Sequence, residues 1–258
     1  MIIMAEEQQA QVEVNKQVEI MAPAPDVQPE EKKTPRKRAP RKPPAEGDGG
    51  AKVTATPSGE ILLFGKYSYD VEIRDPSLKN YVNLKPLVYP NTFRHNSQKK
   101  FSKAAINIVE RLANDMMRGG TGSKIGGHVI RTKGRLQGKK ITVMKIIENA
   151  FDRVHSQSNQ NPLQVLVYAL ENSAPIEDTT RVRYGGIISN VPVDISASRR
   201  LDIAIRNLSM ATITASFGGK KTMTDALSGE LVFAARNDVN SYAIKRKNEI
   251  ERMARSAK

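Results

Sequence analysis

The chain has 258 residues, with 41 Lys and Arg against 27 Asp and Glu, a formal net charge of +14, and no Cys. The lack of Cys excludes disulfides, thiolate zinc sites, iron–sulfur clusters and cysteine nucleophiles. No run of about 18 apolar residues occurs, so we expect no membrane span. No basic patch followed by an apolar stretch opens the chain, so we expect no secretory signal.

The excess positive charge is confined to one part of the chain. Residues 53–258 hold 32 basic and 18 acidic side chains, whereas residues 1–52 hold nine of each. A folded surface that displays this excess attracts polyanions. A charge that serves only solubility is the alternative, but the size of the excess favours a nucleic-acid partner.

Residues 1–58 are predicted to form a disordered extension. The first 31 residues carry seven acids and one Lys, and residues 32–42 are rich in Lys, Arg and Pro. Proline disrupts helices and sheets, and too few apolar groups are present to offset the entropy of ordering. The basic arm either lies along phosphates or is a solvated tail, and we interpret the acidic part as a solvated tail.

Residues 59–258 are predicted to form the folded domain. Residues 61–90 mix aromatic and β-branched residues with turn residues, which indicates an extended wrap over the core. A first helix is expected from Asn96 or Ser97, because apolar residues then recur with a period of 3.6. That stripe comprises Phe101, Ala105, Ile108, Val109, Leu112 and Met116. A Gly-rich basic loop at 119–139 follows.

Most of the remaining chain has helical periodicity. Helices are expected at about 141–157, from Asn161-Pro162, from Ser196 or Ser198, from Thr222, and at 239–256. Residues 175–195 instead alternate β-branched and polar residues around Gly185-Gly186, which predicts a two-stranded ribbon. The sequence therefore predicts a mainly α protein with six helices and one β-ribbon.

Motifs for catalysis and cofactor binding are incomplete. Residues 218–222, GGKKT, lack the first Gly of a Walker loop, and Gly120-Thr-Gly122 lacks the third Gly of a dinucleotide loop. The three His residues are far apart in sequence, and no Gly-x-Ser-x-Gly occurs. We therefore expect no enzyme activity, no metal, no cofactor and no small-molecule substrate.

Basic side chains are the remaining candidates for a functional site. Several groups of them lack matching acids, so each group can neutralise phosphates. Because few aromatics lie among them, we expect recognition of backbone and shape rather than of single strands. The candidate RNA-binding residues are Lys99, Lys100, Lys103, Arg131, Lys133, Arg135, Lys139, Lys140, Arg181, Arg183, Tyr184, Arg199, Arg200, Arg206, Lys220, Lys221, Lys245 and Arg252.

Several segments, in order along the chain, resemble the universal small-subunit ribosomal protein seven family. They are NPLQVLVYALEN at 161–172, EDTTR at 177–181, Gly185-Gly186, VPVDI at 191–195 and Arg199-Arg200. The segments at 64–69 and 240–254 resemble its archaeal and eukaryotic branch. The resemblance covers about residues 61–258. It departs at the first 58 residues and at the loop 119–139, so no family role carries over to those segments.

The resemblance implies a six-helix, bundle-like domain with a protruding β-ribbon that binds the 3′ major domain of small-subunit rRNA. It implies that the protein nucleates assembly of the subunit head, in the cytoplasm, beside other head and platform proteins, messenger RNA and exit-site tRNA. Lys99, Lys100 and Lys103 would contact rRNA, Arg181, Arg183 and Tyr184 would extend from the ribbon, and Arg199 and Arg200 would lie at its base. The alternative function is a regulatory protein that binds messenger RNA away from the ribosome.

Overall fold

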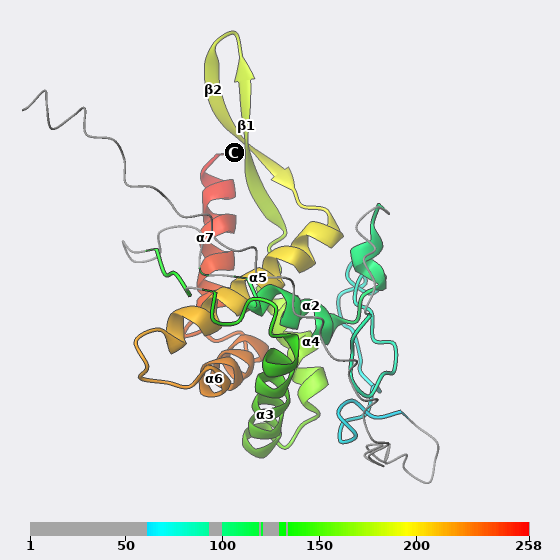
Figure 1. Cartoon of the computed structure of the whole chain (residues 1–258). Coiled ribbons are helices and arrows are strands. Elements are labelled where there is room, and N and C mark those ends of the chain that lie inside the picture. Colours follow the sequence, from blue (N-terminus) through cyan, green and yellow to red (C-terminus); the bar gives the residue numbers. More distant parts are fainter. Residues whose placement is uncertain (1–60, 93–99, 119, 121–128, 133, 258) are drawn as a thin grey trace, which may run out of the picture. The chain divides into compact units, whose positions relative to one another are not determined.

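The computed structural model describes residues 61–92, 100–118, 120, 129–132 and 134–257 (Figure 1). The chain divides into two compact units, residues 1–50 and 51–258, and all described residues belong to the second. The expected extension at 1–58 lies outside them. Within the described residues the fold is mainly α, with six α-helices and one two-stranded sheet, as predicted.

The elements follow one another with short connections except before α3. In chain order they are the 3₁₀ helix η1 (Ser102–Ala105), α2 (Ile108–Met116), α3 (Lys140–Ser158), α4 (Pro162–Ser173), β1 (Glu177–Tyr184), β2 (Ile187–Asp194), α5 (Ala197–Ser216), α6 (Met223–Ala235) and α7 (Tyr242–Ser256).

The core forms where α6 packs against α3, α4 and α5. Phe151 of α3, Leu166 of α4, Leu208 of α5 and Leu227 of α6 are completely buried. Each such side chain contributes about 1.5–3 kcal/mol through the apolar surface it removes from water. The core therefore fixes the helices that carry the basic side chains.

Two predicted helix starts are confirmed by their capping contacts. The Asn161 side chain accepts a hydrogen bond from the Leu163 amide at 3.0 Å, and Pro162 occupies the first helical position of α4. The Thr222 hydroxyl accepts from the Asp225 amide at 3.2 Å at the start of α6. Both side chains satisfy amide groups that have no partner within the helix.

The predicted first helix is wrong over residues 100–107, and its expected start at Asn96 or Ser97 lies outside the described residues. Helix α2 starts only at Ile108, where the Asn107 side chain accepts from the Val109 amide at 3.0 Å. Asn83 takes up backbone groups that a continuous helix would use in the preceding turn. Its side chain donates to the Ala105 carbonyl at 2.6 Å, and its carbonyl accepts from the Ile108 amide at 3.0 Å. These contacts end η1, so the apolar stripe begins at Ile108.

Residues 61–92, here called the strap, wrap over the core without a regular helix or strand, as predicted. Leu63 and Leu78 are completely buried. The strap is held to α3 where Tyr67 Oη donates to Asp152 at 2.6 Å and Lys66 Nζ donates to the same carboxylate at 2.9 Å. Burial raises the pKa of Asp152, but these two hydrogen bonds together with nearby positive charge, mainly that of Lys66, outweigh it and keep the pKa below its ordinary value. The contact therefore stabilises the fold at neutral pH and weakens on acidification.

The ribbon protrudes from the helices beside the C-terminal end of α7 (Figure 1). Its strands pair from Glu177↔Asp194 to Tyr184↔Ile187, which confirms the predicted ribbon at 175–195. Gly185 and Gly186 form the tip with φ of 56° and 89°, a region that favours glycine. An isolated two-stranded ribbon is marginal in water, and here α7 packs against β1 at its base.

Candidate nucleic-acid interface

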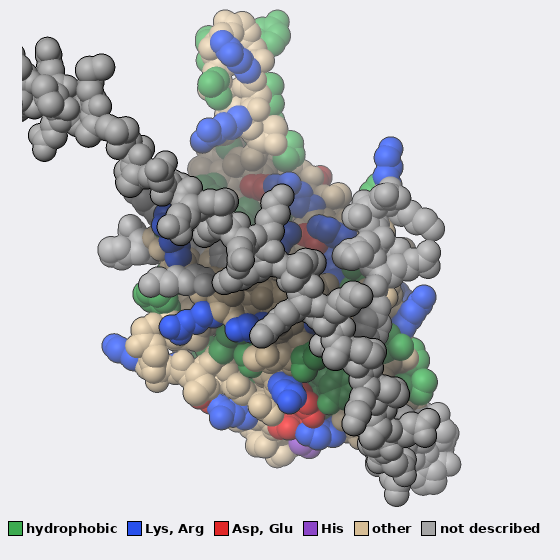
Figure 2. Space-filling view, in the orientation of Figure 1, with side chains coloured by type: hydrophobic (Ala, Val, Ile, Leu, Met, Phe, Trp, Pro, Cys, Tyr) green, Lys and Arg blue, Asp and Glu red, His purple; other side chains and the backbone are tan. Residues whose placement is uncertain are grey.

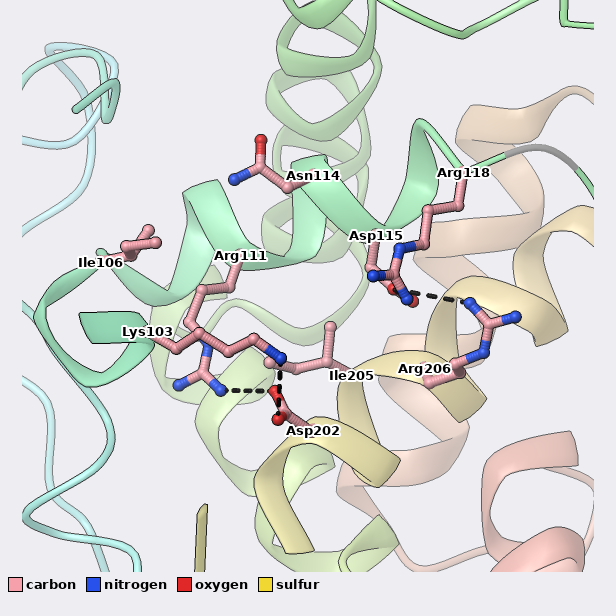
Figure 3. Close-up of a pocket in the computed structure, with 9 residues that line it drawn as sticks. All are labelled: Lys103, Ile106, Arg111, Asn114, Asp115, Arg118, Asp202, Ile205 and Arg206. Atoms are coloured by element: carbon pink, nitrogen blue, oxygen red, sulfur yellow. Dashed lines mark hydrogen bonds and ion pairs between the residues drawn. The ribbon is translucent and has the colours of Figure 1, made fainter. Parts of the chain in front are cut away.

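Two carboxylates bridge α2 and α5, and each holds two basic side chains (Figure 3). Asp202 of α5 accepts from Arg111 Nη2 at 2.8 Å and from Lys103 Nζ at 3.3 Å. Arg111 is 7% exposed and also donates to the Tyr81 carbonyl at 3.2 Å, so its position is fixed by two elements.

Asp115 of α2 is the second bridging carboxylate. It lies 3.5 Å from Arg118 Nη1 and 3.6 Å from Arg206 Nη1, and it accepts a hydrogen bond from the Ser209 hydroxyl. The side chains of Arg118 and Lys103 are both 65% exposed, so these long cations remain in contact with solvent. We refer to the six charged residues Lys103, Arg111, Arg118, Arg206, Asp115 and Asp202 as the α2–α5 cluster.

The α2–α5 cluster lines a hollow of about 220 Å³ and carries four positive charges against two negative ones. The two carboxylates hold the cations in place and neutralise only half of their charge. A phosphate oxygen entering the hollow would therefore meet guanidinium and ammonium groups that are already positioned, which lowers the entropy cost of each contact. Chemically, the cluster is suited to bind an anion.

A second hollow of about 830 Å³ lies on the other side of α5, against α7 and β1. Four basic side chains line it, Arg199, Arg206, Lys245 and Arg246, against the three acids Asp178, Asp202 and Glu249, so one positive charge is in excess. Asp202 and Arg206 line both hollows, so helix α5 joins them into one surface. Figure 2 shows Lys and Arg side chains spread over the helical domain and along the ribbon.

The ribbon has two chemically different faces. Side chains alternate along each strand, and paired residues share a face. The register places Arg181 and Arg183 together on one face, as the sequence predicts. Val182, Tyr184 and their partners lie on the other, where Tyr184 is 87% exposed and Ile187 75% exposed. One face can therefore contact phosphates through two Arg that lie beside the exposed Ile188, and the other offers an apolar surface without a cation.

The sequence-predicted RNA-binding residues fall into four groups: those outside the described residues, those that line the hollows, those exposed elsewhere, and two that form internal ion pairs. Lys99 and Lys133 lie outside the described residues, and Lys103, Arg199 and Arg206 belong to the two hollows. Lys245 lines the second hollow, and the others that remain exposed are Lys100, Arg131, Arg135, Lys139, Arg181, Arg183, Tyr184, Lys220, Lys221 and Arg252. The structure therefore gathers some candidates on α5 and leaves others on separate segments.

Arg200 and Lys140 do not lie on open surfaces as expected. The Arg200 side chain is 12% exposed, 2.9 Å from Asp75, and its Nε donates to the Pro175 carbonyl at 3.2 Å. Lys140 pairs with the buried carboxylate of Glu110. Both cations hold elements of the fold together, because burial of either carboxylate without a partner would be costly.

The sequence reasoning missed Arg111, Arg118 and Arg246, which line the hollows. Arg111 and Arg118 are seven residues apart, which corresponds to two helical turns, although α2 itself ends at Met116 and Arg118 follows its C-cap. Asp115 lies between them at helical spacing. The sequence contains this spacing, but an acid between two bases is also typical of a solvated helix surface, so the pattern alone does not indicate a binding site.

Neither a metal site nor a membrane-spanning helix is found among the described residues. In that part of the chain, no three His, Cys, Asp or Glu residues are grouped so that they could hold a metal ion. Among the same residues, no helix has the length and apolar character needed to cross a membrane.

A hollow with an excess of positive charge on a helical domain, together with two Arg near the tip of a ribbon, is typical of proteins that bind nucleic acid. A model of the family described as ribosomal protein S7p/S5e matches residues 78–258, and the chain belongs to this family. The family resemblance read from the sequence is confirmed. The protein is a structural, rRNA-binding component of the small ribosomal subunit, located in the cytoplasm, in a family whose members are in general not enzymes.

Proposed function

We propose that this protein binds the 3′ major domain of small-subunit rRNA and nucleates assembly of the subunit head. There it lies beside other head and platform proteins and near the path of messenger RNA and exit-site tRNA, and it acts without catalysis. We infer this location in the subunit head from the family motifs at 161–172, 177–181 and 191–195. Its archaeal or eukaryotic affiliation stays a prediction.

The basic surface centred on α5 is the observation that carries this proposal. The α2–α5 cluster supplies fixed cations on one side of the helix. Arg199, Lys245 and Arg246 add cations on the other side, where Asp178 and Glu249 pair with the two Arg. Phosphate contacts of this kind fix the position of a protein on folded RNA through backbone and shape. The helical domain is thus the primary rRNA-binding part.

The first test is the salt dependence of binding to naked small-subunit rRNA. Each neutralised phosphate releases counterions, so log affinity should fall steeply and linearly with log salt concentration. Filter binding between about 50 and 200 mM salt measures this slope. A chemical footprint on the same RNA should fall in the 3′ major domain. A slope near zero, or a footprint elsewhere, would refute the proposal.

Regulation of a messenger RNA away from the ribosome is the alternative outcome. An integral component remains with the small subunit when it is sedimented through high salt, because many contacts hold it at once. A loosely bound regulator leaves under the same conditions. Co-sedimentation at increasing salt therefore distinguishes the two functions.

Shortening the ribbon should separate its role from that of the helices. We expect that replacing residues 181–189 by a short turn barely changes the melting temperature, because all nine are exposed. Binding to isolated rRNA should be mostly retained, whereas exit-site tRNA retention or fidelity should change in a translation assay. Loss of primary rRNA binding in this variant would contradict this division of roles between the ribbon and the helices.

A further inference from the structure

Phe101 is an aromatic side chain whose position the helical core does not explain. It is 81% exposed and immediately precedes η1. Exposing an apolar side chain of this size to water is unfavourable, and burying it would stabilise the protein or its complex. The residue interrupts a basic stretch, since Lys100 precedes it and Lys103 follows two residues later.

The backbone at Phe101 is also strained. Its φ of 60° and ψ of 13° lie in the left-handed region, where a bulky residue is an outlier. Phe64 has a similar φ of 54°, but it is 6% exposed and packs against the rings of Tyr89 and Phe151. Burial offsets the strain at Phe64, whereas exposure leaves it uncompensated at Phe101. Uncompensated strain of this kind is concentrated at functional positions.

The segment that carries Phe101 is fixed to the rest of the fold. The Phe101 carbonyl accepts from the Ala104 amide at 3.1 Å, and the Ala105 carbonyl accepts from Asn83 at 2.6 Å. Lys103 reaches Asp202 of the α2–α5 cluster at 3.3 Å. The ring is therefore presented from a closed turn that is joined directly to the cations of the cluster.

An exposed aromatic ring two residues along the chain from Lys103 of the α2–α5 cluster offers separate contacts for the two chemical parts of a nucleotide, its base and its phosphate. We propose that Phe101 stacks on an unpaired base of the bound RNA while the α2–α5 cluster holds the adjoining phosphates. This inference rests on the rRNA-binding function proposed above and adds a single-stranded nucleotide to what that surface recognises. It also revises the expectation that the protein recognises RNA backbone and shape rather than single strands.

Charge complementarity favours RNA over an apolar protein surface as the partner of Phe101. The hollow beside η1 holds four basic and two acidic side chains, so a protein docking there would need to bury uncompensated positive charge. RNA supplies the opposite charge and an aromatic face in one molecule. Stacking on a base tolerates any base, because every base has a π-face.

The test compares Phe101→Leu, Phe101→Tyr and a control, Phe233→Leu, in the full-length chain. Phe233 is a 42% exposed residue of α6 that lines neither hollow. In filter binding to small-subunit rRNA we expect Phe101→Leu to lose about 5- to 100-fold in affinity, a typical loss for one stacked base. Phe101→Tyr and Phe233→Leu should bind as the unmodified chain does.

Two further readouts identify stacking as the cause of the loss. The slope of log affinity against log salt should stay the same in Phe101→Leu, because no phosphate contact is removed. Binding to a perfectly paired RNA duplex, which offers no free base face, should not change. Phe101→Gly, which suits the left-handed backbone, should retain or raise the melting temperature and still lose rRNA affinity.

The proposal is overturned if Phe101→Leu binds rRNA as tightly as the unmodified chain. It is also overturned if Phe101→Leu binds rRNA normally but fails to join the assembled subunit, since Phe101 would then contact a protein. Either result leaves the steep salt dependence of the unmodified chain intact. Failure of the stacking proposal is therefore distinguishable from failure of the proposed rRNA-binding function.

Discussion

Replacing Glu110 with Ala is expected to lower the free energy of unfolding by about 3 kcal/mol, the range for breaking a buried ion pair. The Glu110 side chain is 2% exposed and accepts from the Thr92 amide at 3.0 Å and from the Thr92 hydroxyl at 3.0 Å. It also pairs with Lys140, which donates to Asn91 at 3.0 Å. One carboxylate thus joins α2, the end of the strap and the first residue of α3.

The loss arises mainly from the groups that Glu110→Ala would leave without a partner. Thr92 would lose the acceptor for its amide, and the half-buried Lys140 ammonium would lose its counter-charge. For a domain of this size we expect a fall in melting temperature of about 10 °C by calorimetry.

Two variants test whether the buried ion pair causes that fall. Glu249→Ala removes an exposed carboxylate that pairs with Arg246 three residues away, and such surface pairs contribute about 0–1 kcal/mol. Its melting temperature should therefore hardly change. Lys140→Met combined with Glu110→Ala removes the unpaired cation and should recover part of the stability. A melting temperature of Glu110→Ala within a degree of the unmodified chain would contradict this account.

The sequence predicts the later helices well because local signals and the core agree there. Asn161 with Pro162, and Thr222 before α6, supply caps directly ahead of apolar residues that the core then buries. The ribbon is equally predictable from the sequence, because alternating β-branched and polar residues replace the helical spacing there and Gly185-Gly186 permits the turn at the tip. In these segments each residue satisfies its local preference and its packing at once.

The sequence misleads where tertiary contacts decide the outcome. Phe101 fits a helical stripe by spacing, but hydrogen bonds from Asn83 end that turn before α2. Arg200 and Lys140 are two cations among many in the sequence, yet the positions of Asp75 and Glu110 make them internal ion pairs. Partners distant in sequence determine each case, so periodicity and charge counts could not reveal them.

Removing three solvent-accessible cations of the α2–α5 cluster is expected to weaken binding to small-subunit rRNA by about 100-fold, from about 1 kcal/mol for each phosphate contact. The variant is Lys103→Ala, Arg118→Ala and Arg206→Ala combined. Arg111 is retained, because its 7% exposed side chain also holds the Tyr81 carbonyl and its loss would disturb the fold. The slope of log affinity against log salt should fall by about 2–3, since each lost contact contributes about 0.7–0.9.

A matched variant shows whether the position of the charge matters or only its amount. Lys79, Lys85 and Lys145 are exposed and line neither hollow, so changing all three to Ala removes the same charge elsewhere. Long-range attraction falls equally in both variants, but only the cluster variant loses cations that Asp115 and Asp202 hold in position. We therefore expect the control to lose much less affinity and to retain its salt slope. Equal losses in the two variants would mean that net charge, rather than the α2–α5 cluster, determines binding.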